Sequence, residues 1–147
     1  MTTRRAFSGA AAALLLSSAV PAFAQQRTPV TIYKSPACGC CGEWVKHMEA
    51  NGFNVEVRDV VDVTPYRRRS MVPDHLASCH TALIGGYAIE GHVPAADVRR
   101  LLRERPRVIG LSVPGMVVGS PGMEQGPPQR YETIAFDERG SRIFARH

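Results

Sequence analysis

Three cysteines, Cys38, Cys40 and Cys41, lie within four residues of one another, and the segments on either side of them restrict the fold. The β-branched and aromatic residues at positions 30–33 predict a strand before the cysteines. Apolar residues at helical spacing follow them and predict a helix that stops at the Asn-Gly pair, residues 51–52. The cysteines therefore belong to a strand-to-helix loop and to the start of the helix.

The pattern after this helix continues to alternate between strands and helices. It predicts a strand at residues 53–61, a short helix at 64–71 with proline near its start, a hairpin of strands at 80–84 and 87–90, and a helix at 94–105. The resulting order, β-α-β-(α)-β-β-α, is similar to the thioredoxin fold in its glutaredoxin-like form, a minimal β-α-β-β-β-α core. We therefore predict an α/β, thioredoxin-like fold.

The C-terminal part of the chain has a different composition. Residues 107–130 are rich in glycine and proline and are predicted to form a C-terminal extension, whose degree of order the composition leaves open. Alternating residues at 131–137 and 142–145, separated by a turn, predict a terminal β-hairpin.

The N-terminal residues 1–24 have the three parts of an export signal peptide. Arg4 and Arg5 supply the positive start, residues 10–20 supply a short apolar run, and small residues precede the expected cleavage site. The paired arginines fit the twin-arginine route as well as the ordinary secretory route. We expect cleavage to leave residues 25–147 as a single exported domain without a membrane anchor, and we expect this domain to be a monomer.

The chain carries a formal net charge of +5, and its basic residues are spread along the sequence. We interpret the run at residues 67–69, and Arg99, Arg100 and Arg103 at helical spacing, as solvated faces. Aromatic residues do not alternate with these arginines, so a nucleic-acid partner is not expected.

Cys38 and Cys41 have the C-x-x-C spacing that occurs both in disulfide oxidoreductases and in metal sites. At a helix N-terminus the helix dipole favours the thiolate, which is the nucleophile in redox chemistry and the ligand in metal binding. Cys40 favours metal binding, because a third thiol beside a redox pair invites mispaired disulfides. Thiolates select soft cations, so copper(I) is the first candidate, zinc an alternative, and an oxygen-labile iron–sulfur cluster the least suitable for an exported protein.

Cys79 is the fourth cysteine, and it precedes the strand predicted at residues 80–84. In a thioredoxin-like fold the segment that enters this strand faces the reactive loop, so we expect Cys79 to lie opposite Cys38, Cys40 and Cys41. Four thiolates could then hold more than one Cu(I) through bridging sulfur atoms.

Two other interpretations of the cysteines remain open. An exported protein with an even number of cysteines usually carries disulfides, for example Cys38–Cys41 together with Cys40–Cys79. Four cysteines allow three pairings, and a non-enzymatic, disulfide-stapled module needs no metal. A thiol–disulfide oxidoreductase that uses Cys38 and Cys41 is the other alternative.

Several histidines are candidate nitrogen ligands. His80 is the strongest, because it adjoins Cys79, and His75 and His92 are weaker because they only flank the predicted strands. His47 is expected to face solvent from the first helix, and the C-terminal His147 is expected to be mobile.

Met116 and Met123 each end a Pro-Gly-Met triplet in the Gly/Pro-rich extension. A thioether is a soft ligand for Cu(I), so both are candidate ligands, with core packing as the alternative.

Five segments together resemble the CopG-like family of periplasmic metal-binding proteins, a former domain of unknown function that is linked to copper resistance. They are residues 33–44, 78–82, 90–94, 110–116 and 119–123. The resemblance implies a thioredoxin-like fold in the periplasm and copper binding by the C-x-C-C cysteines with the later cysteine, which are Cys38, Cys40, Cys41 and Cys79 in this chain. It also suggests interconversion of Cu(I) and Cu(II), an activity of a copper oxidoreductase, and exchange of copper with other periplasmic copper-handling proteins.

Overall fold

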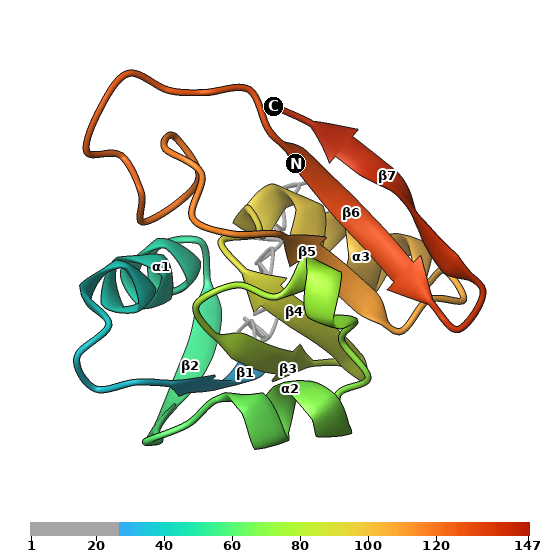
Figure 1. Cartoon of the computed structure of the whole chain (residues 1–147), viewed down its shortest axis with the longest axis horizontal. Coiled ribbons are helices and arrows are strands. Elements are labelled where there is room, and N and C mark those ends of the chain that lie inside the picture. Colours follow the sequence, from blue (N-terminus) through green and yellow to red (C-terminus); the bar gives the residue numbers. More distant parts are fainter. Residues whose placement is uncertain (1–26) are drawn as a thin grey trace, which may run out of the picture.

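The computed structural model describes residues 27–147, so the expected signal peptide at residues 1–24 lies outside the described part of the chain. The described residues form one mixed, seven-stranded sheet with α-helices packed on it, which confirms the predicted α/β class (Figure 1).

The first part of the chain has the predicted strands and helices in the predicted order. Their bounds lie within a few residues of the expected ones: β1 (Thr28–Lys34), α1 (Gly39–Ala50), β2 (Phe53–Asp59), α2 (Thr64–Arg69), β3 (Thr81–Ile84), β4 (Tyr87–Gly91) and α3 (Ala95–Glu104). A 3-10 helix (Asp74–Leu76) between α2 and β3 was not predicted.

The order of the strands in the sheet is β2-β1-β3-β4-β5-β6-β7. Strand β1 pairs in parallel with β2 and antiparallel with β3, where Tyr33 lies opposite Thr81. Because β1 and β3 run in opposite directions, the loop that follows β1 and the segment that precedes β3 meet at the same edge of the sheet. The sheet thereby brings the segment containing Cys79 to the cysteine-bearing end of α1.

The C-terminal strands extend this sheet. They are β5 (Gly110–Val113), which pairs in parallel with β4, and the hairpin of β6 (Glu132–Asp137) and β7 (Gly140–Arg146). The sequence gives no signal of β5, because the strand is short and Pro106 and Pro114 flank it closely. Its residues are nonetheless buried, since it joins the hairpin to the rest of the sheet.

Two groups of buried apolar side chains lie on opposite sides of the sheet. Helices α1 and α3 share the larger core with the strands, and its most deeply buried members include Ile32, Trp44, Met48, Ile89, Val98, Leu101 and Leu111. Ala88 and Phe136 point to the other face, because successive strand residues alternate, and there they pack with Val72 and Leu76. Among residues 27–147 we find no helix long and apolar enough to cross a membrane.

Candidate metal centre

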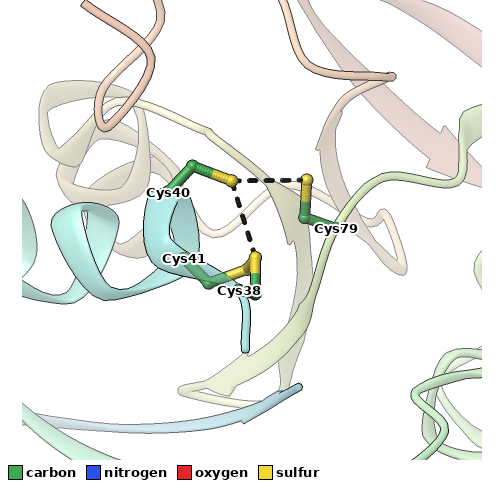
Figure 2. Close-up of side chains that lie close together, drawn as sticks. All are labelled: Cys38, Cys40, Cys41 and Cys79. Carbon is green, nitrogen blue, oxygen red and sulfur yellow. Dashed lines mark hydrogen bonds between the residues drawn. A yellow bond between two sulfur atoms is a disulfide. The ribbon is translucent and has the colours of Figure 1, made fainter. Parts of the chain in front are cut away.

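The four cysteines converge where α1 begins and β3 is about to begin (Figure 2). Cys38 is the residue that precedes α1, Cys40 and Cys41 lie in its first turn, and Cys79 comes from the segment before β3. The four Sγ atoms all lie within 4.8 Å of one another. The expectation that Cys79 faces the first three cysteines therefore holds.

The cysteines are in a half-oxidised state. Cys38 and Cys41 form a disulfide with an S–S distance of 2.07 Å, and Cys40 and Cys79 are free. The Sγ atom of Cys40 lies 3.5 Å from that of Cys38 and 3.8 Å from that of Cys79. Of the pairings left open by the sequence, the structure contains Cys38–Cys41 and leaves the second pair reduced.

This donor set suits a soft metal ion. All the ligand atoms in the group are sulfur, and thiolates select Cu(I) or Zn(II) over hard cations such as Mg²⁺ or Ca²⁺. Reduction of the Cys38–Cys41 disulfide would raise the number of free thiols from two to four without moving the backbone far, since the sulfur atoms are already adjacent.

Cys79 is half-buried, and this changes its acidity. Burial raises the pKa of the Cys79 thiol to about 12, and the neighbouring Cys40 adds to the effect. Cys79 is therefore a neutral thiol at neutral pH, and a metal ion that binds it must displace the proton.

A buried ion pair holds the backbone beside Cys79 in place. The fully buried Glu90 accepts hydrogen bonds from Arg67 Nε at 2.8 Å, from Ser78 N at 2.7 Å and from Thr81 Oγ1 at 2.6 Å. Arg67 Nη2 also donates to Ser78 O at 2.6 Å. Both polar backbone groups of Ser78 are thus fixed, so the position of Cys79 depends on this pair.

Arg67 was expected to lie on a solvated face together with its two neighbours, and this prediction is wrong. Its side chain is only 14% exposed, because it reaches from α2 to the carboxylate of Glu90. Arg68 and Arg69 are exposed as expected.

The first Pro-Gly-Met turn lies beside the Cys79 segment. Gly115 and Ser78 form an isolated parallel bridge, and Ser78 Oγ donates to Gly115 O. Met116 is the residue after Gly115, and Cys79 is the residue after Ser78, so the two lie on neighbouring segments just past the bridge. Its side chain is 60% exposed, which contradicts a core-packing role for Met116.

The second Pro-Gly-Met turn lies on the start of α1. A Cβ atom placed on Gly122 would come within 2.6 Å of Cys40 O and 2.9 Å of Trp44 N. Met123, which follows Gly122, is half-buried. Each triplet thus places a methionine next to a segment that carries one of the two free thiols.

Substitution of Gly122 by alanine should destabilise the fold by about 1–3 kcal/mol, because an L side chain is strained at φ +90° and meets backbone atoms of α1. Equilibrium unfolding in urea measures the change. Gly42→Ala is the matched control: Gly42 lies inside α1 with open space around it, so alanine there should stabilise the helix by about 0.5–1 kcal/mol. Equal effects of the two substitutions would contradict this account of Gly122.

His80 and His92 are fully buried. The His80 ring lies 4.6 Å from that of Trp44 and 5.3 Å from that of His92, measured between centroids. Neither ring nitrogen of His80 has a hydrogen-bond partner, and Nε2 of His92 also has none. The group of converging sulfur atoms includes no imidazole nitrogen, so His80 faces the core of the protein rather than the four sulfur atoms.

The burial of His80 predicts a loss of stability in acid. Burial, with His92 as the next cause, lowers the pKa of His80 from 6.5 to about 3. Between these values the unfolded chain binds a proton that the folded chain does not, so the free energy of unfolding falls as the pH drops below about 6.5. Urea unfolding at pH 7.5 and pH 5 should show this fall. In His80→Gln, the free energy of unfolding should depend less steeply on pH, by up to about 1.4 kcal/mol per pH unit. An unchanged slope in the variant would contradict the assignment to His80.

The chain is similar to one protein family and to two solved structures. The model of a family described as "Protein of unknown function, DUF411" matches residues 76–123. Two solved structures of the copper resistance protein CopG, its forms 2 and 1, superpose with TM-scores of 0.78 and 0.77. Each is 41% identical, and each match covers 82% of this chain and 98% of the other chain. The chain belongs to the CopG family. No curated protein matches it.

The two kinds of match cover different parts of this CopG family member. The residues matched by the family model include Cys79, both buried histidines and both Pro-Gly-Met turns, but they begin after the C-x-C-C cysteines. The CopG structures cover most of the chain, so the family membership rests on them.

Two terminal or surface histidines differ from their predictions. His47 is half-buried, and its Nε2 accepts a hydrogen bond from Ala95 N at 3.0 Å, so it caps α3 instead of facing solvent. His147 is held rather than mobile, because its Nε2 lies 2.9 Å from Asp97 Oδ2 and its ring stacks on Tyr131 at 4.7 Å. His75 is exposed.

Proposed function

We propose that this protein acts in copper resistance in the periplasm and binds Cu(I) through Cys38, Cys40, Cys41 and Cys79 in their reduced form. The observation that supports this most directly is the convergence of four sulfur atoms within 4.8 Å. The similarity to solved CopG structures named as copper resistance proteins supports the choice of copper.

The same sulfur atoms can take zinc, which also binds four thiolates. Copper(I) is preferred here because neighbouring thiolates can bridge several Cu(I) ions, and the adjacent residues Cys40 and Cys41 are poorly suited to separate corners of one tetrahedron. We therefore propose a site that can become multinuclear when it is loaded with Cu(I).

The disulfide supports a redox role for the same cysteines. In the proposed interconversion, the thiolates of Cys38 and Cys41 give up one electron each to two Cu(II) ions. The products are two Cu(I) ions and the Cys38–Cys41 disulfide, which is the state in this structure. Cys40 and Cys79 remain free to hold Cu(I). Whether the protein turns over as a copper oxidoreductase depends on a partner that reduces the disulfide again.

A second candidate function is thiol–disulfide exchange. It is favoured by the disulfide at the start of α1 and by the strand order β2-β1-β3-β4, in which β1 and β2 are parallel and β3 is antiparallel to both neighbours. This order is the one expected of a thioredoxin-like core, which we propose for residues 28–104. Insulin reduction that survives Cys40→Ser would support this function.

Export remains part of the proposal. The sequence of residues 1–24 supports cleavage of a signal peptide. We also propose that the exported protein is a monomer and exchanges copper with other periplasmic proteins. Cell fractionation of the full-length chain, with and without Arg4→Lys and Arg5→Lys, would separate the twin-arginine route from the ordinary one.

The proposed function is tested by titrating the protein with Cu(I) under anaerobic conditions in the presence of bicinchoninate, a competing chromophore. The fully reduced protein should bind more than one Cu(I) per chain, and the form with the Cys38–Cys41 disulfide should bind fewer. A parallel titration with Zn(II) tests the alternative metal. Binding of less than one Cu(I) by the reduced protein would contradict the proposal.

A further inference from the structure

His80 and His92 are buried side by side, and three of their ring nitrogens have no hydrogen-bond partner. We propose that this imidazole pair is a second, nitrogen-only binding site for Cu(I), separate from the cysteines. The proposal rests on the proposed function only for the choice of metal, because the nitrogen atoms and their surroundings define the site themselves.

The hydrogen bond of His92 Nδ1 leaves Nε2, the other ring nitrogen, available to bind a metal ion. Nδ1 of His92 lies 2.8 Å from the carbonyl oxygen of Pro121, which can only accept, so Nδ1 carries the proton and Nε2 carries the lone pair. This Nε2 is the nitrogen without a partner. A histidine that binds a metal typically donates its other N–H to a backbone carbonyl in this way, which fixes the tautomer and the ring orientation.

His80 supplies the second donor. Its ring is fully buried between Trp44 and His92, and at least one of its unpartnered nitrogens carries a lone pair in the neutral form. Trp44 does not compete for that lone pair, because its Nε1–H donates to Val93 O at 2.9 Å. The acidity of the pair agrees with this, since burial lowers the pKa of both imidazoles and keeps them neutral at neutral pH.

The spacing of the rings suits a shared metal ion. A metal–imidazole bond is about 2 Å long, so two nitrogens on either side of one ion lie about 4 Å apart. The ring centroids are 5.3 Å apart in an edge-to-face arrangement, so the two rings are close enough for one nitrogen of each to bind the same ion. Two neutral ligands in a buried site favour a monovalent ion over Zn(II), which normally takes four ligands.

The site lies next to the cysteines without sharing their atoms. Cys79 directly precedes His80, and Gly122 packs against both Cys40 O and His92 Nδ1. The turn at residues 119–123 therefore touches both centres. The proposed site and the cysteine group are therefore neighbours through this turn.

The double variant Cys40→Ser with Cys79→Ser tests the proposal, provided that the Cys38–Cys41 disulfide is kept intact. The chain has four cysteines, so this variant holds no free thiol. It should still bind one Cu(I) per chain in competition with bicinchoninate, using ascorbate, which leaves the disulfide oxidised. X-ray absorption at the copper edge should show nitrogen neighbours at about 2 Å and no sulfur.

Adding His92→Gln to this variant should abolish the binding, whereas adding His75→Gln, which removes an exposed imidazole, should leave it unchanged. Absence of Cu(I) from the double variant, or binding that survives His92→Gln, would overturn the proposal. Failure of the proposed thiolate function is a different result, because it appears as absent binding in the reduced wild-type protein.

A measurement on the wild-type chain avoids dependence on the folding of variants. With ¹⁵N-labelled histidine and the disulfide intact, Cu(I) added beyond the amount that Cys40 and Cys79 bind should shift the Nε2 resonance of His92. The Nδ1 proton bonded to Pro121 should persist. An unchanged His92 spectrum at saturating Cu(I) would overturn the proposal.

Discussion

Replacing Cys79 with serine should lower the affinity of the reduced protein for Cu(I) by more than about a hundredfold. Loss of groups that only orient a metal ligand already costs about 10–100-fold in affinity, and Cys79 is proposed to be a ligand itself. It is also the only member of the group that does not come from the start of α1. Its loss leaves three sulfur atoms from one short segment, so copper would be held from one side.

The affinity is measured by competition with bicinchoninate under anaerobic conditions on fully reduced protein. Met71→Leu is the control, because it removes an exposed soft sulfur atom from a position outside the cysteine group. It should leave the affinity unchanged. An affinity in Cys79→Ser within about threefold of the wild type would show that copper is held by the α1 cysteines alone.

The cysteine group was predictable because its signals are local. Three of the cysteines are neighbours in the sequence, and the strand and helix around them have clear periodicities. The position of Cys79 required the additional step of placing β3 beside β1, which the pairing of Tyr33 with Thr81 bears out. The features that could be predicted, namely the cysteine loop and the approach of Cys79, therefore depend on short segments and on one pairing of strands.

The ion pair of Arg67 and Glu90 was missed because it joins residues 23 positions apart in the chain. A signal for it does exist: Glu90 is a charged residue within the otherwise uncharged strand β4, all of whose residues are buried. A carboxylate at such a position needs a cationic partner, although the sequence does not say which arginine supplies it. The composition of residues 67–69 alone does not distinguish the buried Arg67 from its exposed neighbours.

The orientation of His80 could not be predicted for a related reason. Its position next to Cys79 suggested a shared site, but the side chains of neighbouring residues need not point to the same side. The structure places Cys79 with the other sulfur atoms and His80 against Trp44 in the core. Proximity in the sequence thus suggested neighbours for the His80 ring that differ from those in the structure.

Replacing Arg67 with methionine should lower the free energy of unfolding by about 3–5 kcal/mol. The substitution keeps the apolar stem but leaves Glu90 buried without its cation, and an uncompensated buried charge is strongly destabilising. Urea unfolding of the copper-free protein measures the effect. Arg58→Met is the matched control, because Arg58 pairs with Glu56 on the surface with both side chains 57% exposed. Exposed pairs contribute about 0–1 kcal/mol.

The same substitution separates a structural role of the pair from its role at the cysteines. Arg67→Met combined with Glu90→Gln removes both charges and should recover much of the stability, because no charge is left buried. The double variant still lacks the bond from Arg67 to Ser78 O, so the segment before Cys79 is held less firmly. We therefore expect its Cu(I) affinity to stay about 10–100-fold below that of the wild type while its stability is largely restored. Recovery of both properties together would show that the ion pair stabilises the fold without positioning Cys79.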